Sequence, residues 1–143
     1  MSIVWQQELI ELFRGVPIAR YFGMSLSYGE QGNAFIHLPY NPNLDHALKG
    51  IHGGAIATML DIAGWFAVAA KNEGVWIATS EFKVHLLNPV KESELQAEGW
   101  IVKSGKRISV AEMRVSSSTG ELVAIGTGTY IPLVGVPIGE NTR

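Results

Sequence analysis

The sequence of 143 residues contains no cysteine and few charged residues, which make up 17% of the chain. Without cysteine there is no disulfide framework, no thiolate nucleophile and no cysteine-based zinc site. The formal net charge is −2 and no basic block stands out, which argues against nucleic acid as the main partner. The first residues, MSIVWQQELIELFRG, lack a basic region before an apolar run. We therefore expect no signal peptide and a cytoplasmic protein.

Several motifs of catalysis and cofactor binding are also missing. The chain has no G-x-S-x-G, so a serine-nucleophile hydrolase is unsupported. The stretch GWIVKSGKR has five residues between its glycines and an arginine in place of the hydroxyl, so it is no phosphate-binding loop. GTGT at 126–129 falls in a predicted strand and lacks the helix that follows a dinucleotide-binding turn. The four histidines show no zinc spacing. Neither a metal nor a cofactor is implied.

What the chain does have is one long apolar segment, GIHGGAIATMLDIAGWFAVAA at 50–70, which predicts a helix led by glycines. From Ala55 to Ala70 the only polar side chains are Thr58 and Asp61. These 16 residues span roughly 24 Å, short of the ~20 residues that cross a bilayer core. We expect no membrane span, and a helix apolar on every face must then be covered by protein. Asp61 has no basic residue within one helical turn, so burial should raise its pKa.

The remaining chain predicts an antiparallel sheet wrapped around this helix. Apolar residues at helical spacing over Ile3–Phe13 predict a short amphipathic helix within residues 1–17. Period-two patterns between turn residues predict strands over 20–28, 33–39, 76–89, 94–103, 107–117 and 121–132, with a loop at 40–50 and a frayed tail at 133–143. Alternation should place Thr79, Glu81, Lys83 and His85 on one face.

Consecutive hairpins give an antiparallel sheet, and a sheet of about six strands curls. A curved sheet around one buried helix is the hotdog architecture, so we expect a single α+β domain over residues 1–143 with this fold. One sheet covers a helix on one side only, so a second copy should cover what remains.

Three segments resemble the hotdog acyl-CoA thioesterases of the PaaI type. They are G-I-H-G-G at 50–54 followed by Asp61, T-S-E-F-K-V-H-L-L-N-P at 79–89, and the S-G-K turn at 104–106 with S-S-T-G-E-L-V-A-I-G-T-G-T at 117–129. The resemblance covers roughly residues 20–132. It implies hydrolysis of an acyl-CoA substrate to CoA and a carboxylic acid. It also implies at least a homodimer, and a homotetramer built as a dimer of dimers.

The resemblance assigns the central chemistry to Gly53 and Asp61. Gly53 and Gly54 open the helix, so their backbone N–H groups should point outward unpaired. The Gly53 N–H would polarise the thioester carbonyl at the positive end of the helix dipole, and Gly54 would let substrate approach the backbone. Asp61 would be the general base on water or the nucleophile on the thioester carbon. The alternative for the glycines is tight packing of the turn against the helix. A lone Asp within a helix is often structural.

The spacing of these residues adds a constraint. Eight residues separate Gly53 from Asp61, or roughly 12 Å along a helix. Reacting groups must approach within about 3–3.5 Å, so the Gly53 N–H of one subunit must meet Asp61 of another. Two antiparallel helices across a two-fold axis would give equivalent sites in a dimer.

Further polar residues have roles implied by the resemblance. Thr79 would orient the attacking water, although a strand threonine chosen for β-propensity is the alternative, and Ser80 is the choice if the register shifts by one. His52 would support the glycine turn and the substrate carbonyl. His46 stands where the family commonly carries Asn or Gln; it could hydrogen-bond in the same way or titrate near neutral pH, and Asn43 could replace it.

Contacts to the two ends of the substrate are also expected. Lys103, Lys106 and Arg107 could hold the phosphates of CoA, or they could be ordinary solvated turn charges. Trp65 and Phe66, one turn beyond Asp61, suggest a bulky apolar or aromatic acyl group, or plain core. Two other functions stay open: a hotdog dehydratase or hydratase acting on acyl thioesters, and a non-catalytic acyl-CoA binding protein.

Overall fold

The computed structural model describes residues 2–138. In chain order these residues form α1 (Ile3–Arg14), α2 (Pro17–Phe22), β1 (Ser25–Tyr28), β2 (Ala34–Leu38), a short 3-10 helix (Pro42–Leu44), α3 (Gly53–Ala69), β3 (Val75–Leu86), β4 (Leu95–Ser104), β5 (Ser109–Ser117) and β6 (Leu122–Pro137). No helix in this described part is long and apolar enough to cross a membrane.

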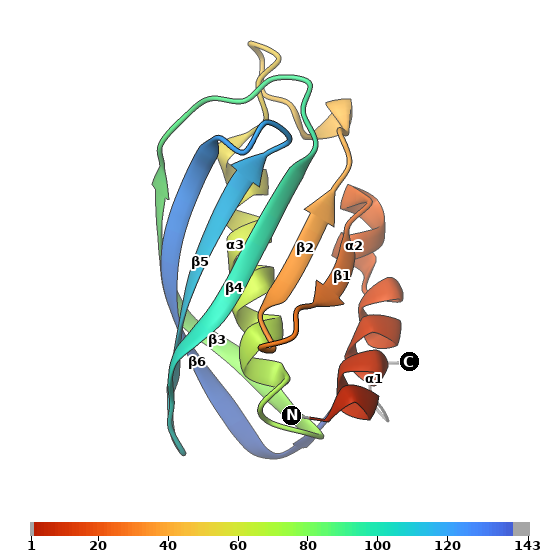
Figure 1. Ribbon diagram of the computed structural model, residues 1–143, viewed down its shortest axis with the longest axis vertical. Coiled ribbons are helices and arrows are strands. Elements are labelled where there is room, and N and C mark those ends of the chain that lie inside the picture. Colours follow the sequence, from red (N-terminus) through yellow and green to blue (C-terminus); the bar gives the residue numbers. More distant parts are fainter. Residues whose placement is uncertain (1, 139–143) are drawn as a thin grey trace.

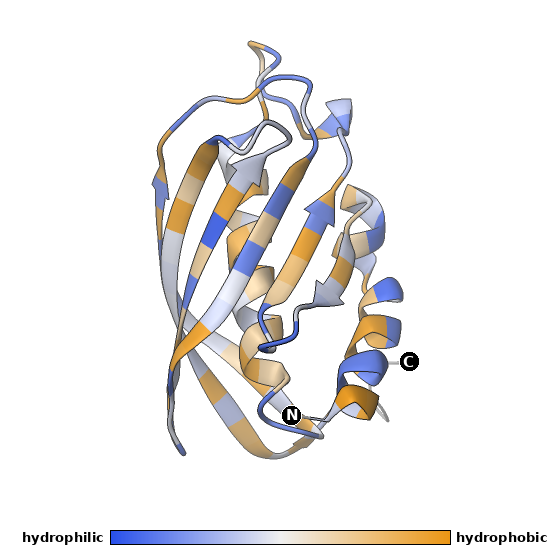
Figure 2. Ribbon diagram, in the orientation of Figure 1, coloured by the Kyte–Doolittle hydropathy of each residue, from blue (hydrophilic) through white to orange (hydrophobic). Residues whose placement is uncertain are grey.

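The strands form one antiparallel six-stranded sheet in the order β1-β2-β4-β5-β6-β3. The sheet curves around α3, and α1 lies beside the helix next to β1 (Figure 1). Apolar and polar residues alternate along the strands while α3 is apolar along its length (Figure 2). The expected hotdog architecture of the α+β class is confirmed.

Small residues let α3 lie close against the sheet. A side chain on Gly99 of β4 would place its Cβ 2.4 Å from the backbone oxygen of Ala63. This contact leaves no room for any residue but glycine, and it fixes the helix across the middle of the sheet. Most of α3 is buried as a result, whereas Ala57, Thr58, Asp61, Ile62 and Trp65 are only partly covered. These partly covered residues form a stripe on the side of the helix that the sheet does not reach.

Two predicted boundaries are wrong. The strand expected over 20–28 is a helix in its first part: Pro17 begins α2 at a position where its missing N–H is not needed, and Gly23 ends it with φ of +82°. The tail expected to fray from residue 133 instead continues β6 to Pro137, where it pairs with Val75 of β3. Residues 139–143 of that predicted tail lie outside the described part of the chain.

The expected hairpin order is wrong at β3. This strand pairs with β6 and not with β4, which follows it in the chain. β3 is consequently an edge strand of 12 residues, and much of it is exposed. The opposite edge, β1, has four residues and lies beside α1. Long, uncovered edge strands offer unpaired backbone groups to another chain.

Candidate active site

Asp61 lies in the middle of α3 and receives hydrogen bonds from two hydroxyl groups. The Thr79 Oγ1 of β3 donates to its Oδ1 at 2.9 Å. The Tyr130 hydroxyl of β6 lies 3.4 Å from the same Oδ1 and 3.2 Å from the backbone oxygen of Asp61, so it donates to both. Both hydroxyl groups donate to Oδ1. The other carboxylate oxygen, Oδ2, receives no hydrogen bond from residues 2–138. Hydrogen bonds thus fix Oδ1 of Asp61 and leave Oδ2 available for a further interaction.

The sequence reasoning missed Tyr130. Its side chain is 0% exposed, and two glycines make room for it. A Cβ on Gly64 would lie 2.2 Å from the tyrosine oxygen, and one on Gly128 would lie 2.7 Å from the ring. A signal was present in GTGTYIP, because Gly128 lies two residues before Tyr130 on the same face of the strand and its missing side chain leaves space for the ring.

A β-bulge aims Thr79 at Asp61. Thr79 opposes Tyr130, whereas Glu81 opposes the next residue, Thr129, so Ser80 is an extra residue on β3. Thr79 therefore points inward with Tyr130, while Glu81 points outward and accepts a hydrogen bond from Thr129 at 2.6 Å. The prediction that Thr79 and Glu81 share a face is wrong for this reason. Ser80 is exposed at the bulge and makes no hydrogen bond to Asp61.

The electrostatic surroundings of Asp61 favour its neutral form. Desolvation by burial raises the pKa of the Asp61 carboxyl above its ordinary value, and the hydrogen bonds from Thr79 and Tyr130 lower it in part. Burial and the nearby carboxylate raise the pKa of Tyr130, so its hydroxyl stays protonated and donates. No lysine, arginine or histidine of the described chain forms an ion pair with Asp61. A raised pKa without a cationic partner is typical of a carboxylate that takes up a proton during a reaction.

The start of α3 supplies one free donor. His52 is the N-cap, and its Nδ1 accepts a hydrogen bond from the Gly54 N–H at 2.8 Å. The expectation that both glycine N–H groups are unpaired is therefore wrong for Gly54. The Gly53 N–H has no acceptor among the described residues. Since Nδ1 accepts, neutral His52 carries its proton on Nε2, which is a second donor at this end of the helix.

His46 lies within the turn that precedes the helix. Its Nδ1 accepts from the backbone N–H of Leu48 at 3.1 Å, and its Nε2 would lie 2.8 Å from a Cβ on Gly50. The ring therefore stabilises its own loop, and Asn43 belongs to the 3-10 helix, where its N–H is bonded to Asn41. No hydrogen bond links either residue to Asp61.

An apolar groove opens beside Asp61. It lies between α1 and α3, has a volume of about 1200 Å³, and is lined by Asp61, Trp65, Phe66 and Trp76 together with apolar residues of α1. The Trp65 indole is fixed by a 2.7 Å hydrogen bond to the backbone oxygen of Ile77. Trp65 and Asp61 thus line the same groove, as a contact between Trp65 and the substrate would require.

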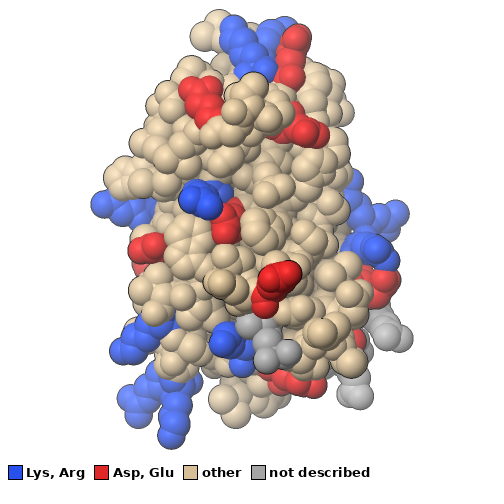
Figure 3. All heavy atoms as spheres, viewed as in Figure 1, with Lys and Arg blue, Asp and Glu red and all other residues tan. Residues whose placement is uncertain are grey.

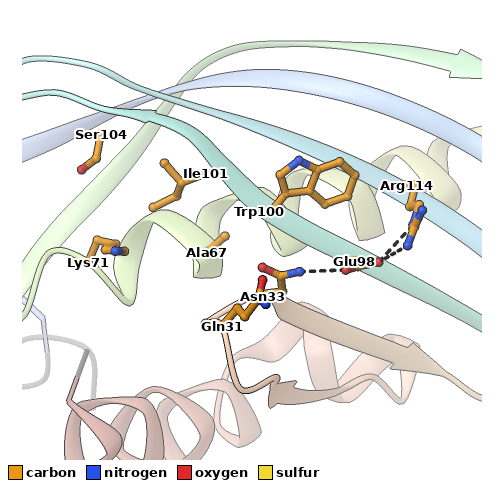
Figure 4. Close-up of a pocket in the computed structure, with 10 residues that line it drawn as sticks. Gln31, Asn33, Ala67, Lys71, Glu98, Trp100, Ile101, Ser104 and Arg114 are labelled. Atoms are coloured by element: carbon orange, nitrogen blue, oxygen red, sulfur yellow. Dashed lines mark hydrogen bonds and ion pairs between the residues drawn. The ribbon is translucent and has the colours of Figure 1, made fainter.

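A second pocket, of about 530 Å³, lies near the turn between β1 and β2 (Figure 4). Within it, Glu98 accepts hydrogen bonds from Asn33 and from Arg114. The Arg114 guanidinium also lies 5.6 Å from the centre of the Trp100 ring. Asp61 does not line this pocket, which is therefore separate from the groove beside the carboxylate.

The predicted phosphate contacts are exposed and lie far along the sheet. Lys103, Lys106 and Arg107 belong to β4 and the turn before β5, at the end of the sheet opposite the start of α3 (Figure 1). Basic side chains gather at this end in the space-filling view (Figure 3). The described chain contains no group of three or more acidic or histidine side chains that could hold a metal ion.

Comparison with known proteins identifies the family. The sequence profile of the thioesterase superfamily matches residues 48–124, which include the helix start, Asp61, Thr79 and most of the sheet. The chain belongs to the thioesterase superfamily. The expected family and the general activity of a thioester hydrolase are thereby confirmed.

Individual proteins are similar to this chain over nearly its whole length. A candidate esterase of Saccharolobus solfataricus is 27% identical over 124 residues, 87% of this chain and 83% of the relative. A thioesterase-family protein of Silicibacter pomeroyi has a TM-score of 0.84 and 27% identity, and the match covers 92% of this chain and 99% of that one. The PaaI protein from the phenylacetic acid degradation operon of Escherichia coli shares the fold with a TM-score of 0.82, at 18% identity, over 91% of this chain and 94% of that one.

The hydroxyl groups around Asp61 predict a specific pH dependence. If ionised Asp61 is required, kcat/KM rises with pH through the pKa of Asp61, and this limb lies above the ~3.9 of an ordinary aspartate. Tyr130→Phe and Thr79→Val each remove a donor that stabilises the charged carboxylate, so both move the limb to higher pH. Tyr40→Phe removes a hydroxyl that binds the exposed side of Asp45 and leaves the limb in place. Unshifted limbs in both site variants would contradict this reading of the site.

Proposed function

We propose that the chain is a cytoplasmic acyl-CoA thioesterase that hydrolyses its substrate to CoA and a carboxylic acid. The observation that carries the proposal is the desolvated carboxylate of Asp61, held through Oδ1 by Thr79 and Tyr130 with no cationic partner in the described chain. The free N–H of Gly53 at the start of the same helix supplies the complementary donor.

Water attack on the thioester carbonyl uses both groups. The Gly53 N–H, with the helix dipole behind it, stabilises the negative charge that develops on the carbonyl oxygen. Oδ2 of Asp61 takes a proton from water as the water oxygen bonds to the carbonyl carbon. The tetrahedral intermediate then expels the CoA thiolate, which takes up the proton, and the acid is released. If Oδ2 instead attacks the carbon directly, the carbon–sulfur bond breaks, the CoA thiolate leaves and is protonated by solvent, and water then cleaves the anhydride to release the acid and the Asp61 carboxylate.

Completing this site requires a second protomer. Gly53 and Asp61 lie on one continuous helix, eight residues or roughly 12 Å apart, so they cannot act on one carbonyl within a protomer. Antiparallel pairing of two β3 edges about a two-fold axis would extend the sheet and set two α3 helices side by side in opposite directions. Asp61 of each protomer would then face the Gly53 end of the other. A homotetramer would be a dimer of such dimers.

Other residues serve the same substrate in this proposal. His52 offers its Nε2–H to the thioester carbonyl beside the Gly53 N–H, Gly54 keeps the approach to the backbone open, and His46 stabilises the preceding loop. Lys103, Lys106 and Arg107 attract the phosphates of CoA through charge that is exposed at the end of the sheet.

Replacing the carboxylate tests the activity. Asp61→Asn keeps an acceptor for Thr79 and Tyr130 but removes the base, so thioester hydrolysis should fall by at least about 100-fold across a panel of acyl-CoA esters. Thiol release reports hydrolysis, and ligand binding measured in parallel shows that the variant is folded. Undiminished hydrolysis in Asp61→Asn removes the mechanism. Binding without turnover in the natural protein indicates an acyl-CoA binding protein, and water loss from a 3-hydroxyacyl thioester indicates a dehydratase.

Replacing Gly53 tests the oxyanion donor with a matched control. Proline is well tolerated at the first position of a helix, and His52 already has the extended backbone (φ −62°, ψ 134°) that a residue before proline requires. Gly53→Pro therefore removes the N–H with little change to the helix and should lower kcat by about 10²–10³-fold. Gly53→Ala adds the same Cβ, which meets only the tip of Leu86, but keeps the N–H. An equal loss of kcat in the two variants would show that the added side-chain atoms at position 53, and not the missing N–H, lower the activity.

A further inference from the structure

We propose that the groove between α1 and α3 holds the acyl group of the thioester and selects neutral, extended aliphatic acyl groups over short ones and over those that end in a carboxylate. This inference rests on the proposed thioesterase function and adds a substrate class to it. It follows from where the groove begins, how far it extends, and which charges line it.

The groove begins at the proposed reacting carboxylate. Asp61 lines it, and Trp65 and Trp76 lie alongside, with their ring centres 5.2 Å apart in an edge-to-face arrangement. A carbonyl placed at Asp61 therefore has an apolar space next to it for whichever substituent it carries. Apolar and aromatic walls with few polar groups are typical of sites that bind apolar ligands.

The length of the groove follows from two contacts between α1 and α3. The Phe13 ring packs edge-on against Phe66 with centres 5.0 Å apart, and the Trp5 indole donates a 2.8 Å hydrogen bond to the backbone oxygen of Ala69. Trp5 and the adjacent Val4 both line the groove. Since Ala69 lies eight residues beyond Asp61 on α3, the groove reaches roughly 12 Å past the carboxylate.

That length suits a long acyl group better than a short one. A staggered alkyl chain advances roughly 1.3 Å per carbon, so about nine carbons reach the end of the groove at Val4. A butanoyl group would fill only the part near Trp65 and leave the remaining apolar wall in water. Each methylene buried there is removed from water, so affinity should rise with chain length until the groove is filled.

The charge of the lining decides which end of the substrate enters. The ionisable residues that line the groove are Asp61, Glu8 and Glu11, all acidic, and no lysine, arginine or histidine of the described chain lines it. Arg14 pairs with Glu11 from outside. Neither the phosphates of CoA nor a carboxylate at the far end of an acyl chain finds a cation inside this groove. The acyl group enters here, and CoA extends away.

The test compares acyl-CoA esters of matched head group on the full-length protein. kcat/KM is measured for butanoyl-, octanoyl-, decanoyl-, benzoyl- and suberoyl-CoA, the last being an octanoyl chain that ends in a carboxylate. Decanoyl-CoA should exceed butanoyl-CoA, and octanoyl-CoA should exceed suberoyl-CoA, each by at least about tenfold. Benzoyl-CoA should fall below decanoyl-CoA. The affinities of octanoyl- and butanoyl-CoA for Asp61→Asn give the same comparison without turnover.

A matched pair of substitutions on the first turn of α1 tests the end of the groove. Val4 lines the groove and is 69% exposed, whereas Ile3 does not line it and is 74% exposed. Val4→Trp shortens the groove and should lower the decanoyl-to-butanoyl ratio by about tenfold, while Ile3→Trp leaves that ratio unchanged.

The outcomes separate this inference from the proposed function. Thioester hydrolysis with a flat chain-length profile, or an equal effect of both tryptophan substitutions, overturns the inference and leaves the function standing. Affinity that rises with chain length without any hydrolysis supports the groove and contradicts the function. A change of oligomeric state in Val4→Trp at constant chain-length preference shows that another protomer fills the groove, and the inference fails.

Discussion

The structure depends on a carboxylate placed inside a helix that is otherwise apolar on nearly every side. Removing an ionised carboxylate from water is unfavourable unless hydrogen bonds replace the lost hydration. Thr79 and Tyr130 supply two such bonds, yet desolvation still dominates and the pKa of Asp61 stays raised. This balance leaves Asp61 with a raised pKa and, within residues 2–138, without a paired cation that would lower that pKa again.

Much of the surrounding architecture follows from this requirement. The bulge at Ser80 turns Thr79 inward, and the missing side chains of Gly64 and Gly128 admit the Tyr130 ring beside the helix. Both hydroxyl donors come from β3 and β6, the pair of strands at one edge of the sheet. The same edge is the one that another protomer can reach, so the side of the molecule that holds the carboxylate is also the side that is open to a partner.

Part of this could be predicted from the sequence, because composition and spacing determine it. The buried helix and its outlying Asp61 follow from a run with only two polar side chains, and the resemblance to known thioesterases placed Thr79 near Asp61. Pairing of β3 with β6 could not be predicted from hairpin order, since that contact joins strands far apart in the chain. The bulge was missed because period-two alternation assumes an unbroken register. Tyr130 was missed with it, since its role emerges only when β3, β6 and α3 are placed together.

The most direct test of the account is complementation between inactive protomers. Asp61→Asn and Gly53→Pro chains, each inactive alone, are mixed and allowed to exchange subunits. If each site takes its acid from one protomer and its helix start from the other, half of the dimers are mixed and hold one intact site, which restores about a quarter of the natural activity. Mixing Asp61→Asn with Thr79→Val should restore no activity. Asp61 and Thr79 contribute to a site from the same protomer, so neither site of a mixed dimer holds both natural residues. If the mixture of Asp61→Asn and Gly53→Pro chains is no more active than the two variants measured separately and added, the shared site is contradicted.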